Sequence, residues 1–285
     1  MIDPALVARI ADLELVARIV VEGSLSGLHR SPFHGYSAEF SQYRRYRPGD
    51  DLKYLDWKLA ARTGRLYTKQ FRETTNLAAT IVVDSSASMN FPSDPPVSKL
   101  ACARTLAAAL AYLISTQGDA VGLATADAFV GARTGRRHLQ SLLATLATLE
   151  PSGTFRADAV VRLAADRLRR RGLLIVVSDF YDDEELTFEA LRLAARRGHE
   201  VAILQTMSRE EIAFPFARDL EFVDLENGGR VTLDAAAARR AYGDQVSAFL
   251  ERWRSRAGRE GMQYALVVTD TPPDRALRAF LLART

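Results

Sequence analysis

The beginning of the chain joins one regular pattern to a long aperiodic stretch. Apolar residues recur at helical spacing from Leu6 to Val20, which predicts an amphipathic helix. Residues 29–51, HRSPFHGYSAEFSQYRRYRPGDD, follow neither the helical nor the strand period. They predict an ordered, extended loop with a turn at Pro48-Gly49.

A helix and two strands are expected between this loop and the second domain. A helix capped by Asp50 or Asp51 is expected to run to Gly64. Its Trp57 is expected to be a core residue. Strands are expected at residues 65–73 and 77–84. We therefore predict an N-terminal helical and aromatic-basic module in residues 1–75 and a second domain in residues 76–285.

From Asp84 onward the pattern alternates between helix and strand. Residues 221–234 also predict a hairpin around Asn227-Gly228-Gly229. Such alternation is typical of an α/β fold in which helices cover both faces of a mostly parallel sheet. Helices are expected at residues 97–116, 138–149, 157–171, 185–197, 234–258 and from 273, and strands at 119–127, 128–133, 173–179, 200–206 and 262–270.

Composition narrows the class of protein. The 285 residues include 48% hydrophobic and 26% charged residues, as in ordinary globular proteins. The single cysteine, Cys102, excludes an internal disulfide framework and fits a reducing compartment. Acids interrupt the apolar N-terminal pattern, and no eighteen apolar residues run together, so we expect a cytoplasmic protein without a membrane contact.

Charge is unevenly distributed along the chain. The formal net charge is +3, but residues 29–72 contain ten Arg or Lys against four Asp or Glu. Arginines interleaved with Tyr43 and Tyr46 suggest nucleic-acid binding through residues 43–72 as one alternative function. Three aspartates interrupt this segment, and pairing within the protein is the interpretation we favour.

Candidate chemistry lies where two apolar runs end. In the stretch IVVDSSASMN, a run of β-branched residues is followed by Asp84 and then by Ser86 and Ser88. In the stretch LLIVVSD, a second apolar run is followed by Asp179. The loop EPSGTFRAD delivers Thr154 between them. Because ligands of open α/β sheets bind beyond the carboxyl ends of the strands, these oxygens are expected to share one divalent cation.

These three separated pieces resemble the metal-ion-dependent adhesion site of von Willebrand factor A domains. By that resemblance, Asp84, Ser86 and Ser88 form the first element, Thr154 the second and Asp179 the third. The resemblance implies a divalent cation, with Mg²⁺ the first choice and Mn²⁺ or Ca²⁺ as alternatives. It also implies that an acidic residue of a partner protein completes the coordination of the ion.

The upstream segment YRRYRPGDDLKYLDWKLAARTGRLYTKQF resembles the signature of the bacterial family called domain of unknown function 58. Many relatives begin with two membrane helices, and this chain resembles the shorter form without them. The resemblance implies a MoxR-type AAA+ ATPase as partner, with this chain acting as an adaptor in assembly or maturation of other proteins. The signature residues, a candidate partner surface, are Arg44, Tyr46, Pro48, Gly49, Asp50, Asp51, Asp56, Trp57 and Arg62.

An enzyme is the remaining alternative. A phosphohydrolase of the haloacid-dehalogenase type also places an aspartate at a strand end near Mg²⁺. Such enzymes normally use a second aspartate two residues later as general acid, where this chain has Ser86. We therefore expect an interaction protein without catalytic residues.

Overall fold

The chain folds into two compact units, which are described separately. The computed structural model describes residues 3–4, 12–25, 38–47, 50, 54–73, 77–92, 97–168, 171–216 and 219–283. The smaller unit is Phe33–Asn76, and the larger one joins Met1–Pro32 to Leu77–Thr285. This division differs from the predicted one at residue 75, because helix α2 (Leu13–Leu25) buries its apolar stripe within the larger unit, against α4 (Lys99–Thr116).

A six-stranded sheet forms the centre of the larger unit, in the order β10-β7-β6-β3-β4-β5. All neighbouring strands run parallel except β5, which is antiparallel to β4. The predicted α/β class with a mostly parallel sheet is confirmed. The strands are β3 (Ala78–Val83), β4 (Ala120–Ala124), β5 (Phe129–Arg133), β6 (Leu173–Ser178), β7 (Glu200–Met207) and β10 (Gln263–Val268).

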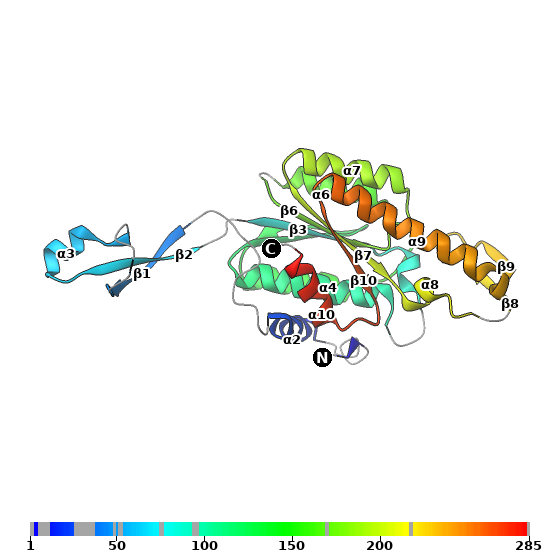
Figure 1. Cartoon of the computed structure of the whole chain (residues 1–285), viewed down its shortest axis with the longest axis horizontal. Coiled ribbons are helices and arrows are strands. Elements are labelled where there is room, and N and C mark those ends of the chain that lie inside the picture. Colours follow the sequence, from blue (N-terminus) through cyan, green and yellow to red (C-terminus); the bar gives the residue numbers. More distant parts are fainter. Residues whose placement is uncertain are drawn as a thin grey trace. The chain divides into compact units, whose positions relative to one another are not determined.

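Helices cover both faces of this sheet (Figure 1). Helix α4 packs on one face beside α5 (Arg136–Ala147) and α10 (Pro273–Leu282). The other face carries α6 (Ala157–Arg167), α7 (Glu184–Arg196) and α9 (Ala235–Arg259). Among the helices in the described part of the chain, none has both the length and the apolar character needed to cross a bilayer.

The two central strands explain why the sheet is so completely enclosed. Every residue of β6 is buried, and so are the β-branched residues Ile81, Val82 and Val83 of β3. Such side chains fill the pleated surface on both faces when helices lie above and below. On the α7 and α9 face, Trp253 is fully buried against Phe180 and Phe188, with ring centroids 4.5 and 6.0 Å apart.

The smaller unit contains an antiparallel ribbon of β1 (Ala38–Arg45) and β2 (Tyr67–Glu73) with a helix, α3 (Trp57–Thr63). The prediction of a loop over residues 29–51 is therefore wrong for β1. An irregularity in the register between Phe40 and Gln42 interrupts the two-residue period by which a strand is recognised in a sequence.

Helix α3 starts later than predicted. Asp56 caps it by accepting a hydrogen bond from the Leu59 amide at 3.0 Å, in place of Asp50 or Asp51. The prediction that Trp57 is a core residue is wrong, since 63% of it is exposed. A helix of seven residues without a buried position has no apolar face to contribute to a core.

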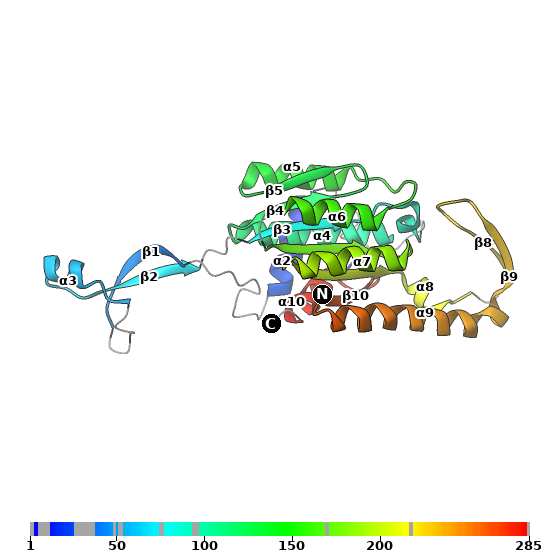
Figure 2. The same ribbon diagram turned by 90° about the horizontal axis from the view of Figure 1, so that it is seen from above.

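A second antiparallel ribbon lies near the carboxyl ends of the central strands (Figure 2). It consists of β8 (Asp219–Val223) and β9 (Arg230–Asp234), so the predicted hairpin around Asn227 is confirmed. A short helix, α8 (Arg209–Ala213), precedes it, and Asp234 caps the long helix α9 that follows.

Candidate functional site

The two predicted carboxylates meet at one edge of the central sheet. Strands β3 and β6 are parallel neighbours, with Val83 opposite Val177, and the amide of Asp84 donates to the carbonyl of Val177 at 2.9 Å. Asp84 and Asp179, the first residues after the two strands, are 3% and 1% exposed. Adjacent parallel strands thus bring two acids, distant in the sequence, to the same buried edge.

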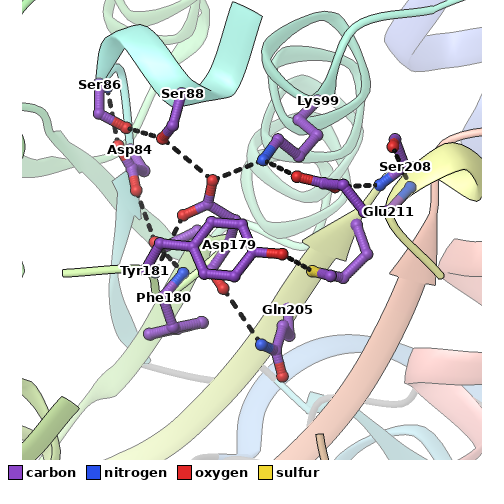
Figure 3. A network of polar contacts seen from close by, with 12 residues as sticks. Asp84, Ser86, Ser88, Lys99, Asp179, Phe180, Tyr181, Gln205, Ser208 and Glu211 are labelled. Atoms are coloured by element: carbon purple, nitrogen blue, oxygen red, sulfur yellow. Dashed lines mark hydrogen bonds and ion pairs between the residues drawn. The ribbon is translucent and has the colours of Figure 1, made fainter. Parts of the chain in front are cut away.

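The serines bridge these acids through hydrogen bonds (Figure 3). The Ser86 amide donates to Asp84 Oδ1 at 2.8 Å, and the Ser86 and Ser88 hydroxyl oxygens lie 2.9 Å apart. Ser88 Oγ then donates to Asp179 Oδ2 at 3.1 Å. The short helix η2 (Ala87–Asn90) turns the chain so that both serines face the acids.

Ser178 and Phe180 shape the opposite side of the network. Ser178 Oγ donates to Asp84 Oδ2 at 2.5 Å and accepts from the Phe180 amide at 2.9 Å. Phe180 has a φ of +60°, a strained conformation for a residue with a side chain. Its buried ring, packed against Trp253, holds this turn in place.

Thr154 belongs to a loop that lies directly beside the serine turn. The Ser152 amide donates to the carbonyl of Ser85 at 2.9 Å, and the Ala87 amide donates to that of Gly153 at 3.0 Å. Gly153 adopts a φ of +56°, which glycine allows without strain. The structure thus joins four of the five predicted ligands in one network, while Thr154 lies beside it with an exposed side chain.

Two charged residues that the sequence analysis did not identify complete the site. The ammonium group of Lys99 lies 2.7 Å from Asp179 Oδ2 and 2.6 Å from Glu211 Oε1, and only 1% of its side chain is exposed (Figure 3). Glu211 also forms a capping box with Ser208 at the start of α8. The site therefore contains a buried ion triad as well as the predicted oxygens.

The position of Lys99 at the start of a helix was a signal in the sequence for its role in the site. Ser98 caps helix α4, so Lys99 occupies its first position, where the helix dipole disfavours a cation. A sequence that breaks a local rule at a helix start often does so for a functional contact. The capping pattern of Ser208 and Glu211 was likewise visible, but the contact of Glu211 with Lys99 spans 112 positions.

The electrostatics of the site leave negative charge uncompensated. Burial, followed by the nearby charge of Asp179, raises the pKa of Asp84 to about 7, against the hydrogen bonds from Ser178 and Ser86. Burial alone would lower the pKa of Lys99, but the charges of Asp179 and Glu211 outweigh it and raise that pKa. When all four groups are ionised, three carboxylates face one ammonium, which leaves two negative charges.

One oxygen spacing at the site, that of the two hydrogen-bonded serine hydroxyls, matches the spacing of ligands on a small divalent cation. Octahedral Mg²⁺ holds its ligands at about 2.0–2.1 Å, so neighbouring ligand oxygens lie roughly 2.9 Å apart. The two serine hydroxyl oxygens have this spacing. Among the described residues there is no metal-binding group of three or more His, Cys, Asp or Glu side chains, so an ion at this edge depends on hydroxyls as well as acids.

A pocket of about 480 Å³ adjoins the network. It is lined in part by Ser88, Lys99 and Glu211 from the site and by aromatic residues that follow α8. The site is thus accessible from the side of the β8–β9 hairpin, where a ligand can approach Ser88.

The signature residues lie in the smaller unit. Arg44 pairs with Asp50 at 2.7 Å, and Tyr43 donates to Asp56 Oδ2 at 2.8 Å. The amide of Tyr46 bonds to the carbonyl of Leu66. The Arg44–Asp50 pair is one of the expected ion pairs between aspartates and arginines, whereas the contact of Tyr43 with Asp56 was not predicted.

The remaining signature residues lie either on helix α3 or outside the described residues. Trp57 and Arg62 lie at the first and last turns of the exposed helix α3. Pro48, Gly49 and Asp51 lie outside the described residues.

Comparison with known proteins relates most of the chain to one family. Residues 42–251 match the family described as "Protein of unknown function DUF58". The uncharacterized protein Rv1480 of Mycobacterium tuberculosis (strain ATCC 25618 / H37Rv) is 34% identical over 234 residues, which cover 79% of this chain and 73% of that protein.

Two solved structures are similar to parts of this chain, and the first of them shares its α/β architecture. An aerotolerance-related membrane protein from Bacteroides fragilis NCTC 9343 is 18% identical with a TM-score of 0.50, over 73% of this chain and 98% of that one. The SpRpn10 VWA domain is 12% identical with a TM-score of 0.40, over 73% and 94%. The larger unit shares its α/β fold with the Bacteroides fragilis protein. The chain belongs to the DUF58 family.

Proposed function

We propose that this chain is a protein-interaction module that docks an acidic side chain of its partner on a bound divalent cation. The ion would polarise and fix the partner's carboxylate. The observation that carries the proposal is the hydrogen-bonded edge at which three carboxylates, those of Asp84, Asp179 and Glu211, meet a single ammonium group, that of Lys99. The ligands would be Asp84, Ser86, Ser88, Thr154 and Asp179.

The donor set explains why the partner would contribute an acid. Asp84 and Asp179 neutralise a divalent cation only in part, because Lys99 already compensates Asp179. Hydroxyl ligands add no charge, so coordination positions remain for water or for an outside carboxylate. Such a contact would give specificity and a steep dependence on the metal.

The partner we propose is a MoxR-type AAA+ ATPase, as the family resemblance described above implies. The chain would then act as an adaptor during assembly or maturation of other proteins. Mg²⁺ is the cation we propose, with Mn²⁺ or Ca²⁺ as alternatives.

The two alternative functions gain no specific support. A haloacid-dehalogenase-type phosphohydrolase would need an acid two residues after Asp84, and Ser86 is engaged with Ser88 there. Nucleic-acid binding through residues 43–72 would use the arginines of this segment, and one of them, Arg44, is paired with Asp50.

Calorimetric titration of Mg²⁺ and Mn²⁺ into the wild type and the Asp84→Ala variant tests the proposal. We expect the substitution to weaken metal binding on the order of 100-fold or more, because it removes a charged group of the site. Asp127→Ala, which removes an exposed acid after β4, is the matched control and should bind metal like the wild type.

Association with the ATPase is then measured in Mg²⁺ and in chelator, with circular dichroism as the check on folding. Loss of association in chelator and in Asp84→Ala is the expected result. Equal association of the wild type in both conditions would contradict docking through the ion, and the smaller basic unit would become the better candidate.

A further inference from the structure

The tip of the β8–β9 hairpin is held in one conformation by its own hydrogen bonds. Asp224 Oδ1 accepts from the Glu226 amide at 2.8 Å, and Asp224 Oδ2 accepts from the Asn227 side-chain amide at 2.6 Å. Gly228, with a φ of +72°, allows the chain to turn back. Glu226 therefore extends from an ordered turn.

Aromatic packing anchors the base of the same hairpin. The ring of Phe222 on β8 stacks on Phe214 at 5.7 Å and meets Phe216 edge to face at 5.6 Å. Phe214 also contacts Tyr242 of α9 at 4.5 Å. The hairpin is thus fixed to α8 and α9 beside the carboxyl edge of the sheet (Figure 2).

Glu226 lies where this hairpin meets the candidate ion site. It lines the same pocket as Ser88 and Lys99, and its side chain remains open to solvent. The Glu226 carboxylate is hydrogen-bonded with Ser88, one of the predicted ligands, and the charges of Asp179, Asp224 and Asp182 act on it. A carboxylate gathered with other acids in this way is stabilised when a cation lies among them.

We propose that Glu226 is an internal acidic ligand of the divalent cation, supplied by the hairpin at the position that the partner's acid takes in the complex. The inference rests on the proposed function, because it concerns the same ion. It adds a residue from a third part of the chain, beyond the strand ends and the Thr154 loop.

An internal ligand has two opposite effects on binding. In the free protein, Glu226 adds a negative charge and an oxygen to the ion, so it strengthens metal binding. In the complex, the partner's acid has to displace Glu226 and loses part of its affinity in doing so. Removing the carboxylate should therefore weaken metal binding and strengthen binding of an acidic partner.

Titration of Mn²⁺ alone into the full chain tests the assignment. Glu226→Gln keeps the size of the side chain and removes its charge, and we expect Mn²⁺ affinity to fall on the order of tenfold. Water-proton relaxation should rise for the variant, because water replaces the lost carboxylate on Mn²⁺. Glu221→Gln is the matched control, since Glu221 lies on the same hairpin and pairs with Arg230 at 2.9 Å.

The outcomes separate this inference from the function on which it rests. Weaker Mn²⁺ binding in Glu226→Gln, with Glu221→Gln within twofold of the wild type, supports it. Equal binding by wild type and Glu226→Gln overturns it, while Asp84→Ala still reports the ion site. If wild type and Asp84→Ala bind Mn²⁺ alike, both the ion site and the internal ligand are wrong.

Discussion

Asp84 and Asp50 show how two regions of the molecule treat the same residue type in opposite ways. Asp84, at the edge of the central sheet, has its pKa raised to about 7 by burial and by the charge of Asp179. Asp50, in the smaller unit, has its pKa lowered by hydrogen bonds from the Arg47 amide and the Arg44 guanidinium. One carboxylate lacks a compensating charge, and the other already has one.

The contrast separates a binding role from a supporting one. A buried carboxylate with serine partners and no basic partner among the described residues is strongly stabilised by an added cation. A carboxylate bound to arginine at an accessible ribbon stabilises local geometry and gains little from a further ligand. The sheet edge is thus the region suited to bind a cation, and the Arg44–Asp50 pair supports the ribbon.

Lys99→Met should produce the largest effect. The substitution leaves Asp179 and Glu211 facing each other in a buried site without their ammonium partner. Breaking a buried ion pair from one side costs about 3–5 kcal/mol of the free energy of unfolding. Urea denaturation measures the loss, and the Lys99→Met/Glu211→Gln double variant should recover part of it; a loss below about 1 kcal/mol would contradict the importance of the triad.

The raised pKa of Asp84 predicts a pH dependence with a defined sign. Between pH 4 and pH 7 the metal-free folded state binds a proton at Asp84 that the unfolded state releases, so this group's contribution to stability falls as pH rises. The difference between wild type and Asp84→Asn should change by on the order of 2–4 kcal/mol across this range.

Thermal unfolding in chelator at a series of pH values, for both proteins, measures this dependence. Mg²⁺ should oppose it, since the ion requires the ionised carboxylate, and its stabilising effect should grow with pH. A wild-type and an Asp84→Asn profile that run parallel would show that Asp84 titrates normally.

The smallest effect is expected from Asp50→Asn. The substitution removes the charge that pairs with Arg44 but leaves the hydrogen bond from the Arg47 amide possible. We expect the ribbon to open more often, with limited proteolysis between Arg44 and Arg62 a few-fold faster and metal binding at the sheet edge unchanged. Rapid cleavage of this segment in the folded wild type would contradict its supporting role.

Local patterns were sufficient to predict much of the larger unit. β-Branched runs marked β3 and β6, the order of helices and strands indicated a parallel sheet, and Asn227-Gly228-Gly229 marked the hairpin. The meeting of Asp84 and Asp179 was predicted on the condition that their strands are neighbours, and the sheet order fulfils that condition. These features depend on nearest neighbours in the sequence or on a general rule of sheet topology.

Only the tertiary structure decided which distant groups meet that edge. Lys99 reaches Asp179 across 80 positions and Glu211 across 112, and Glu226 approaches through a hairpin whose aromatic base packs on α9. Likewise, the exposure of Trp57 depends on what packs on α3, which its apolar spacing does not specify. A sequence encodes the period and the ends of its elements locally, whereas the partner of a side chain depends on how whole elements pack, through contacts spread over the entire core.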